Sequence, residues 1–295
     1  FFFFLIASFV IGVAATILQV VLNLYLTVCR IGKTTALQRQ MIGGTSNSIG
    51  MAIAPLVISY LIFHGTPLHD IVTKQFIIPL IILILIMLII TLLVGKTQMP
   101  SIDNVRQAPG EKFDKSVWSF RNLKLGVWGI FFYVGIEVAV GANVNMYASE
   151  LGGSFASNAT HMAALYWGLL LLGRFLGSFI KQVPSEKQLV IASIGAIVLL
   201  VLAMLTANPW ILTLIGFFHS IMWPAIFTLA TDQLGKYTTK ASGVLTMGVI
   251  GGGIIPLLQG IFADVMGGNW LWTWLLVIAG EAYILYYGLN GYKQH

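Results

Sequence analysis

Nine long runs of apolar residues follow one another along the chain, and their length limits what the chain can fold into. The run from Phe76 to Gly95 contains no charged residue. A helix needs about 20 apolar residues to cross a bilayer core, and backbone groups in lipid must bond within helices or closed barrels. An alternating strand pattern is absent, so we expect helices near 2–29, 38–63, 75–95, 124–148, 160–180, 188–207, 209–231, 240–262 and 269–291.

The composition excludes an ordinary soluble domain. Hydrophobic residues make up 58% of the chain and charged residues 9%, whereas soluble chains carry about 25% charged residues. The predicted fold class is therefore an all-α polytopic membrane protein with nine transmembrane helices, whose partner is the lipid bilayer. We expect a monomer.

The basic residues predict an orientation. If the first span ends in the cytoplasm, the inner loops and flanking turns contain 14 of the 16 basic residues, namely Arg30, Lys33, Arg39, Lys96, Arg106, Lys112, Lys115, Arg121, Lys124, Lys181, Lys187, Lys236, Lys240 and Lys293. This asymmetry follows the positive-inside rule. It explains the net charge of +6 without a nucleic-acid partner, and it predicts that segment 96–123 and the C-terminus are cytoplasmic.

One eight-residue pattern occurs twice. Ile49 to Leu56 and Ile250 to Leu257 match at five of eight positions, which indicates two related halves of a secondary transporter. Coincidence between Gly- and Pro-rich membrane segments is the alternative. In both copies a Gly and a Pro lie where a membrane helix can bend, so we expect gating or bending at Gly50, Pro55, Gly251 and Pro256.

The polar stretch 96–123 divides the spans unequally. Three spans precede it and six follow it, so we expect a three-helix remainder of an N-terminal half (1–95), a cytoplasmic linker (96–123) and a C-terminal six-helix half (124–295). Applied to the second half, the repeat offset predicts that about 80 residues, or three helices, precede Phe1 in the parent protein.

Glu137 is the clearest polar residue within a predicted span. A charged side chain at the bilayer centre costs about 2.5–3.5 kcal/mol on insertion scales, so it indicates a function. Helical spacing places it on one stripe with Tyr133, Gly141 and Asn145. We interpret Glu137 as a substrate-binding and proton-coupling candidate; the alternative is a hydrogen-bonded Glu that joins helices.

Other polar residues lie at similar depths. Gln19 and Asn23 continue a small and polar face of the first span, where helix packing and ligand contact are equally good explanations. Asn47 lies between two serines of the second span. His219, just before Trp223 and Pro224, is either a packing residue or a substrate contact. Gln259 completes the polar candidates.

Two more charged residues fall within spans. Arg174 lies between Gly173 and Gly177, which fit a small-xxx-small helix contact, and its long side chain can extend to the interface. We expect a structural or gating role for it. For Glu281 we expect structural pairing.

The sequence lacks enzyme, metal and cofactor signatures. There is no His-Glu-x-x-His, no paired aspartates and no Gly-rich phosphate loop, and no second His lies at ligand spacing from His219. Gly44-Thr45-Ser46 is a weak match to an intramembrane serine nucleophile, without a His placed to activate it. We therefore expect neither an enzyme, nor a metal site, nor a cofactor.

Taken together, several motifs resemble the major facilitator superfamily, and within it the fucose permease-like group with its glucose/galactose and N-acetylglucosamine carriers. The similar stretches are Leu18 to Asn23, Asn47 to Gly50, Phe131 to Glu137, Tyr166 to Gly168, Gly173 to Phe175, Ser220 to Phe227 and Gly251 to Gly260. The resemblance covers nearly the whole chain and implies the major facilitator fold, with family helices 4–12 present.

The resemblance also implies a function. It implies uptake of a hexose or amino sugar across a bacterial inner membrane, driven by a cation gradient (proton or sodium) through alternating access. Fucose permeases couple protons through carboxylates in helices one and four, and the helix-four position matches Gln19, which cannot titrate. Asn47 matches a sugar-contacting carboxamide, while His219 and Leu24 stand where the group usually has Asn and Pro.

A sugar offers hydroxyls that both donate and accept, so the predicted site combines carboxamides and acceptors with aromatic rings. The predicted substrate-binding residues are Gln19, Asn23, Asn47, Tyr133, Glu137, Asn145, Trp167, His219, Trp223 and Gln259. The alternatives are a carrier of the same fold for a drug or peptide, and a transporter-derived sensor.

Overall fold

The computed structural model describes residues 2–29, 32–56, 74, 77–98 and 113–294. Contacts divide the chain into two units, one formed by Phe1–Thr45 with Ile102–His295 and the other by Ser46–Ser101. Each unit is treated by itself below. The division at residues 95 and 123 expected from the sequence stays a prediction, and most of the expected linker lies outside the described residues.

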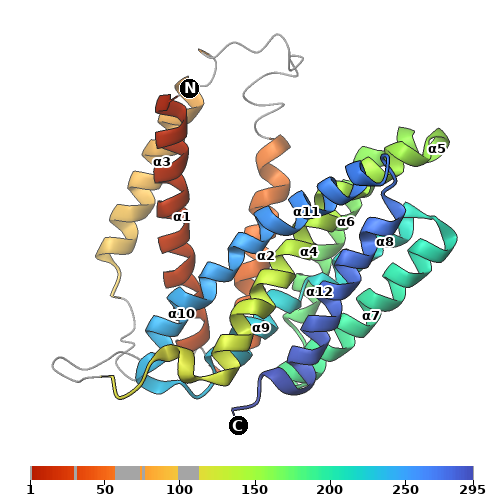
Figure 1. Cartoon of the computed structure of the whole chain (residues 1–295). Coiled ribbons are helices and arrows are strands. Elements are labelled where there is room, and N and C mark those ends of the chain that lie inside the picture. Colours follow the sequence, from red (N-terminus) through yellow and green to blue (C-terminus); the bar gives the residue numbers. More distant parts are fainter. Residues whose placement is uncertain (1, 30–31, 57–73, 75–76, 99–112, 295) are drawn as a thin grey trace. The chain divides into compact units, whose positions relative to one another are not determined.

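The described secondary structure is helical (Figure 1). The longer helices are α1 (Phe2–Val28), α2 (Ala36–Leu56), α3 (Ile77–Lys96), α4 (Arg121–Leu151), α6 (Ala159–Gly177), α7 (Ser185–Thr206), α8 (Pro209–His219), α9 (Met222–Thr231), α10 (Thr238–Thr246), α11 (Gly251–Val265) and α12 (Trp274–Tyr286). Short elements are α5 (Gly153–Ser157), the 3-10 turns η5 (Val117–Ser119), η6 (Gly235–Tyr237), η7 (Met247–Ile250) and η8 (Leu271–Thr273), and the π-helical turn η9 (Tyr287–Gly291).

Six helical spans among the described residues are long and apolar enough to cross a membrane. Within the described residues, each of the nine predicted spans overlaps helix, but three of them are not uniform. The predicted span 209–231 is broken into α8 and α9 at Ser220 and Ile221. Because Pro224 has no N–H group, the carbonyl of Ser220 loses its helical partner, and the break falls at that carbonyl.

The predicted spans 240–262 and 269–291 are also interrupted. The first consists of α10, the turn η7 and α11, with Pro256 inside α11. The second begins with η8 and ends in the π-helical turn η9. The second predicted span, 38–63, begins earlier than expected because α2 starts at Ala36; residues 57–63 lie outside the described part.

In the unit Ser46–Ser101, α3 is apolar on every side. Within the described residues of this helix no side chain is buried. A helix that is apolar all round and uncovered by protein is suited to contact lipid chains.

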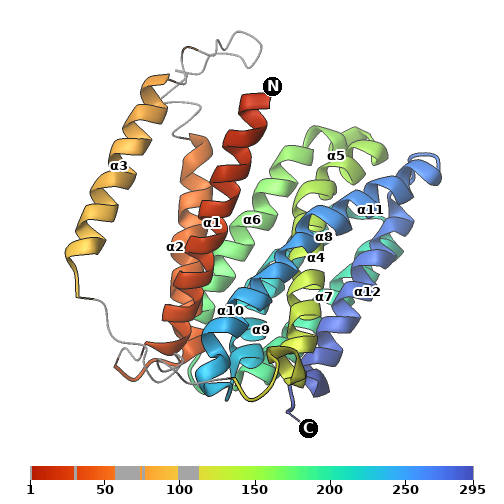
Figure 2. The same ribbon diagram turned by 60° about the vertical axis from the view of Figure 1, so that its left-hand side comes forward.

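In the other unit, α4 is the central helix, and α11 crosses it closely, as both views show (Figures 1 and 2). A methyl group on Gly251 of α11 would collide with the carbonyl of Phe131. One on Gly135 of α4 would lie 3.0 Å from the carbonyl oxygen of Gly251 and would overlap Ile255. These two glycines therefore allow the backbones to approach, as small residues do in membrane helix pairs.

The start of α2 is held by a capping box. The backbone N–H of Gln38 donates to Oγ1 of Thr35 at 3.2 Å, and the N–H of Thr35 donates to Oε1 of Gln38 at 3.1 Å. This reciprocal pair satisfies two of the donors that every helix start leaves free. The amide of Gln38 also donates to the carbonyl of Ser178 at 2.8 Å, which ties the start of α2 to the end of α6.

Thr35→Ala is expected to lower the free energy of unfolding by about 0.5–2 kcal/mol, because it removes the capping oxygen. The measurement is thermal or denaturant unfolding in detergent micelles. Thr91→Ala is the matched control, since Thr91 is exposed and bonds only to Met87 one turn back in α3. Equal effects of the two changes would contradict the capping role.

The end of this unit that contains the start of α2 also contains several basic residues, some of which bond to backbone carbonyls. Arg121 donates to the carbonyls of Asn290 and Lys293. Lys236 pairs with Asp114 at 3.1 Å, and Lys240 lies over the ring of Phe113. Residues that the charge pattern assigned to one membrane face thus contact one another.

Candidate functional site

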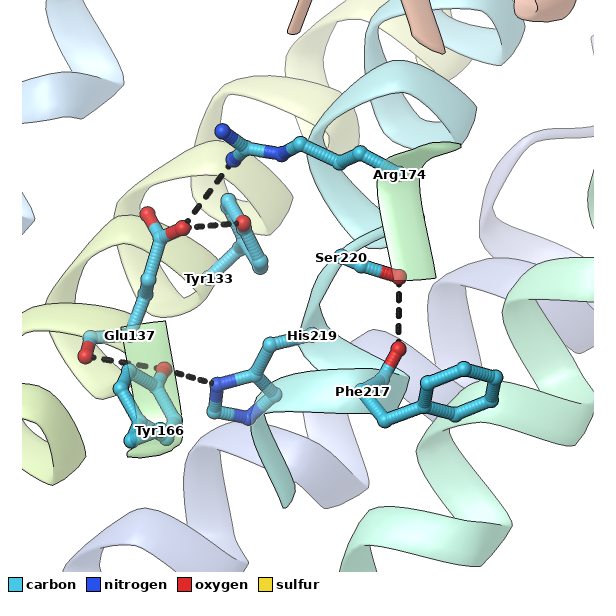
Figure 3. Close-up of polar contacts among 7 residues, drawn as sticks. All are labelled: Tyr133, Glu137, Tyr166, Arg174, Phe217, His219 and Ser220. Atoms are coloured by element: carbon cyan, nitrogen blue, oxygen red, sulfur yellow. Dashed lines mark hydrogen bonds and ion pairs between the residues drawn. The ribbon is translucent and has the colours of Figure 1, made fainter. Parts of the chain in front are cut away.

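The site centres on a carboxylate in the middle of α4. Glu137 accepts at one oxygen, Oε1, from the phenol of Tyr133 at 2.7 Å and from Nη2 of Arg174 at 3.2 Å (Figure 3). The side chains of Glu137 and Arg174 are 13% and 10% exposed, so the ion pair is nearly but not fully covered. We call Tyr133, Glu137 and Arg174 the acidic cluster.

The spacing of residues along α4 and α6 helps to explain how the side chains of the acidic cluster come together. Tyr133 and Glu137 are one helical turn apart on α4 and therefore share a face. Side chains of a helix lean toward its N-terminus, so Arg174, near the end of α6, extends back along its own helix. A methyl group on Gly44 of α2 would lie 3.2 Å from Cδ of Arg174, so this glycine leaves room for the arginine side chain.

The expectation that Arg174 extends to the membrane interface is wrong. The arginine is 8% exposed and its guanidinium is paired with Glu137. The small-xxx-small contact is present: Gly173 adjoins Ser220 at the end of α8, and Gly177 adjoins Met41 of α2.

A second polar chain begins at the backbone of Glu137. The hydroxyl of Tyr166 lies 3.1 Å from the carbonyl oxygen of Glu137 and 2.6 Å from Nδ1 of His219. Nε2 of His219 lies 2.6 Å from Oε1 of Glu281 on α12. His219 and Glu281 are both 0% exposed, so Tyr166 connects a fully buried pair to the acidic cluster. Figure 3 shows the part of this chain that runs from Glu137 through Tyr166 to His219.

Two tryptophans border these groups. The ring of Trp223 lies 6.5 Å from that of Tyr133, and the ring of Trp167 lies 5.2 Å from that of Tyr166, centroid to centroid. A methyl group on Gly141 would lie 2.5 Å from the Trp167 indole. Both tryptophans are half-buried, so each presents an uncovered part of an aromatic surface beside polar groups.

Other predicted residues of the C-terminal helices lie elsewhere. Gln259 is 0% exposed and its amide is used twice: Oε1 accepts from Asn143 at 2.9 Å, and Nε2 donates to Thr273 at 3.1 Å. These bonds join α4, α11 and η8. Asn145 is half-buried on α4, and its buried Oδ1 has no hydrogen-bond partner among the described residues.

Among the described contacts, none joins the predicted residues of α1 to the acidic cluster. On α1, Gln19 is half-buried and Asn23 is 8% exposed, and the Asn23 carbonyl accepts from Gln40 at 2.8 Å. Asn47 and Gly50 belong to the unit Ser46–Ser101, so their relation to Glu137 stays a prediction. The side chain of Pro55 lies outside the described residues.

Sequence reasoning did not assign Tyr166, Asn143 or Glu281 to the site. In the sequence, Tyr166 is distinguished only as part of the Tyr166-Trp167-Gly168 motif. Asn143 is one of several amide residues in α4, and nothing in the sequence sets it apart. Glu281 was expected to form a structural pair, without a named partner. Two features of the sequence could have predicted that His219 pairs with Glu281. Glu281 is a charged residue deep in the last span, and His219 is a lone His within another span.

Comparison with known proteins agrees with this architecture. The family model described as Major Facilitator Superfamily matches residues 1–254. A glucose/galactose transporter of Brucella abortus is 35% identical over 99% of this chain and 72% of the relative. The L-fucose-proton symporter of Escherichia coli is 26% identical over 90% of this chain and 66% of the relative.

A solved structure shows the same fold. The crystal structure of the transporter FucP in the outward conformation superposes with a TM-score of 0.78 at 23% sequence identity, over 93% of this chain and 72% of that chain. These relatives are transporters rather than enzymes. With the family model matching most of its length, this chain is a multi-pass membrane protein that belongs to the Major Facilitator Superfamily.

Proposed function

We propose that this protein is a secondary active carrier that takes up a hexose or amino sugar by cation symport through alternating access. We place it in a bacterial inner membrane, with segment 96–123 and the C-terminus in the cytoplasm. Its partners are then the sugar, the coupling cation and the lipid bilayer, and we expect a monomer. The glucose/galactose and fucose carriers among its relatives support the substrate class.

The observation that carries the proposal is the acidic cluster beside two tryptophans. A sugar ring has hydroxyls that need both acceptors and donors, and a less polar face that packs on aromatic rings. Glu137 offers acceptors, and Arg174 offers donors. Trp223 borders the cluster at Tyr133, and Trp167 packs against Tyr166, whose hydroxyl bonds to the carbonyl of Glu137; both tryptophan rings are half-buried.

The remaining predicted residues complete the proposed site. Asn145 has a buried amide oxygen that lacks a described partner, which supports including it as an acceptor for a ligand hydroxyl. Gln19, Asn23 and Asn47 are further sugar-contacting residues in this proposal. The bonds of Gln259 to Asn143 and Thr273 join α4, α11 and η8, which favours a structural part for Gln259.

Glu137→Gln is expected to weaken hexose binding about tenfold or more. A hydrogen bond to a charged group contributes about 1.5–3 kcal/mol, and about 1.4 kcal/mol is a tenfold change in affinity. The measurement is counterflow of labelled D-galactose, D-glucose, L-fucose and N-acetylglucosamine in liposomes, with thermal stabilisation by each sugar as a second readout.

Glu150→Gln is the matched control, because Glu150 lies at the exposed end of the same helix and accepts from the N–H of Trp270. Unchanged sugar binding by Glu137→Gln would remove Glu137 from the site, and intact gradient-driven accumulation would remove it from coupling. If the wild-type protein showed counterflow with none of these sugars, the proposed substrate class would fail.

A further inference from the structure

The polar chain that begins at the acidic cluster ends in a pair of titratable side chains with no exposure. We propose that His219 and Glu281 together hold the transported proton, and that Tyr166 reports its presence to the sugar site. This inference rests on the proposed function, because it names the place of the coupling ion in that carrier.

The carboxylate of Glu281 has one hydrogen-bond partner among the described residues, the imidazole of His219. Its Oε1 lies 2.6 Å from Nε2 of His219, and its buried Oε2 has no hydrogen-bond partner in the described part of the chain. A buried charge without a counter-charge is very unfavourable in a membrane interior. The pair is therefore neutral only when it holds an extra proton, either as imidazolium with carboxylate or as imidazole with carboxylic acid.

The single hydrogen of the Tyr166 hydroxyl distinguishes two states of the pair. With the extra proton, Nδ1–H donates to the phenol oxygen, a second proton lies between Nε2 and Oε1, and the hydroxyl donates to the carbonyl of Glu137. Without it, Nε2–H donates to Glu281, and the hydroxyl turns to donate to Nδ1. Both arrangements fit the distances of 3.1, 2.6 and 2.6 Å.

The proton balance is simple. One proton enters from water on one side of the membrane, the pair changes from a net charge of −1 to zero, and the same proton leaves to water on the other side. Because the Glu137 carbonyl gains or loses a hydrogen bond in each step, proton binding alters the backbone that carries the acidic cluster.

The neighbouring titratable groups are already engaged. From α4, Tyr133 packs its ring edge-on against His219 and bonds to Glu137. From α6, Arg174 is paired with Glu137. On α12, Tyr283 donates to the carbonyl of Leu125. The described charged residues of α7, Glu186 and Lys187, lie in its first turn, and α9 contains none.

Glu137 is less suited to carry the proton. Its Oε1 accepts from two donors, Tyr133 and the cationic Arg174, which is the arrangement expected of an ionised carboxylate with its counter-charge beside it. In the described part of the chain no fixed cation bonds to the His219–Glu281 pair, so in this proposal a mobile proton supplies the positive charge.

The test measures protons moved per sugar. The intact protein in liposomes with a trapped pH indicator receives D-galactose, and proton and sugar entry are recorded together. Glu281→Gln is expected to lower the proton-to-sugar ratio at least tenfold, while D-galactose counterflow stays measurable because exchange requires no net proton movement. Asp264→Asn, at the exposed end of α11, is the control and should retain the wild-type ratio.

Each other outcome has a defined meaning. A wild-type ratio in Glu281→Gln would overturn the inference. Net sugar entry by the wild type without any proton entry would also overturn it, although the sugar carrier itself would then stand. If the wild type shows no counterflow with D-galactose, D-glucose, L-fucose or N-acetylglucosamine, the proposed function is refuted instead, and the proton measurement is made with whichever of these sugars does exchange. If Glu281→Gln does not assemble, infrared difference spectra of the wild type with and without D-galactose decide: a change in a protonated-carboxyl or imidazolium band supports the site, and unchanged bands overturn it.

Discussion

Arg174→Met is expected to lower the free energy of unfolding by about 3–5 kcal/mol, because it leaves the charge of Glu137 buried without a counter-charge. Glu137 is 13% exposed and receives its one cationic hydrogen bond among the described residues from Arg174. Met preserves much of the length and apolar character of the arginine stem, so the lost charge dominates the effect. The measurement is thermal or denaturant unfolding in detergent micelles.

The double variant Arg174→Met with Glu137→Gln is the decisive control. It removes both charges, so it is expected to recover most of the lost stability, and the coupling between the two sites follows from the double-mutant cycle. Lys187→Met, at an exposed position in the first turn of α7, should stay within about 0.5 kcal/mol of the wild type. A double variant no more stable than Arg174→Met would show that the arginine acts through packing instead.

Gly251→Ala is expected to destabilise the protein by about 1–3 kcal/mol, the usual cost of adding a methyl group to a packed interface. The added carbon would collide with the backbone carbonyl of Phe131 on α4, which cannot move aside as a side chain can. Either the crossing of α4 and α11 opens or the helix shifts. Unfolding in micelles measures the loss, and sugar counterflow measures its effect on transport.

Gly253→Ala supplies the matched control two residues away. A methyl group there meets nothing within 4 Å, and Ala is favoured over Gly in a helix by about 0.5–1 kcal/mol. The two substitutions should therefore have opposite signs. If Gly251→Ala were as stable as Gly253→Ala, the close approach of these helices would not depend on the glycine.

The role of Gly251 illustrates a change of interpretation. The repeated Gly and Pro pattern predicted a bending point, and a 3-10 turn, Met247–Ile250, does precede Gly251. The described contacts add that Gly251 is required where α11 meets α4, which is a packing reason rather than a flexing one. Whether Gly251 and Pro256 also bend during transport stays a prediction.

Helical periodicity alone was sufficient to predict that two residues of the site share one face of a helix. Tyr133 and Glu137 lie one turn apart, and their shared face follows from 3.6 residues per turn alone. Periodicity has no information about which residue of another helix lies opposite. Arg174 was therefore expected at the interface, although it is paired with Glu137, and His219 was not connected with Glu281, 62 residues further along the chain.

The interrupted spans have a local cause that the sequence contains. Pro224 lacks the N–H that would continue α8 into α9, so a break near Ser220 was predictable in principle. A window that averages hydropathy over about 20 residues cannot detect it, because both short helices are apolar.

The amino-acid sequence by itself determined that the chain is an all-helical membrane protein, where its spans lie, which of its faces are polar and which superfamily it belongs to, because these follow from local composition, spacing and motif content. Only the tertiary structure decided the partners: Arg174 with Glu137, Tyr166 with His219, and His219 with Glu281. The physical reason is that a buried polar group must be satisfied by whichever side chain the packing of another helix brings within about 3 Å, and that packing depends on contacts between residues far apart in the chain.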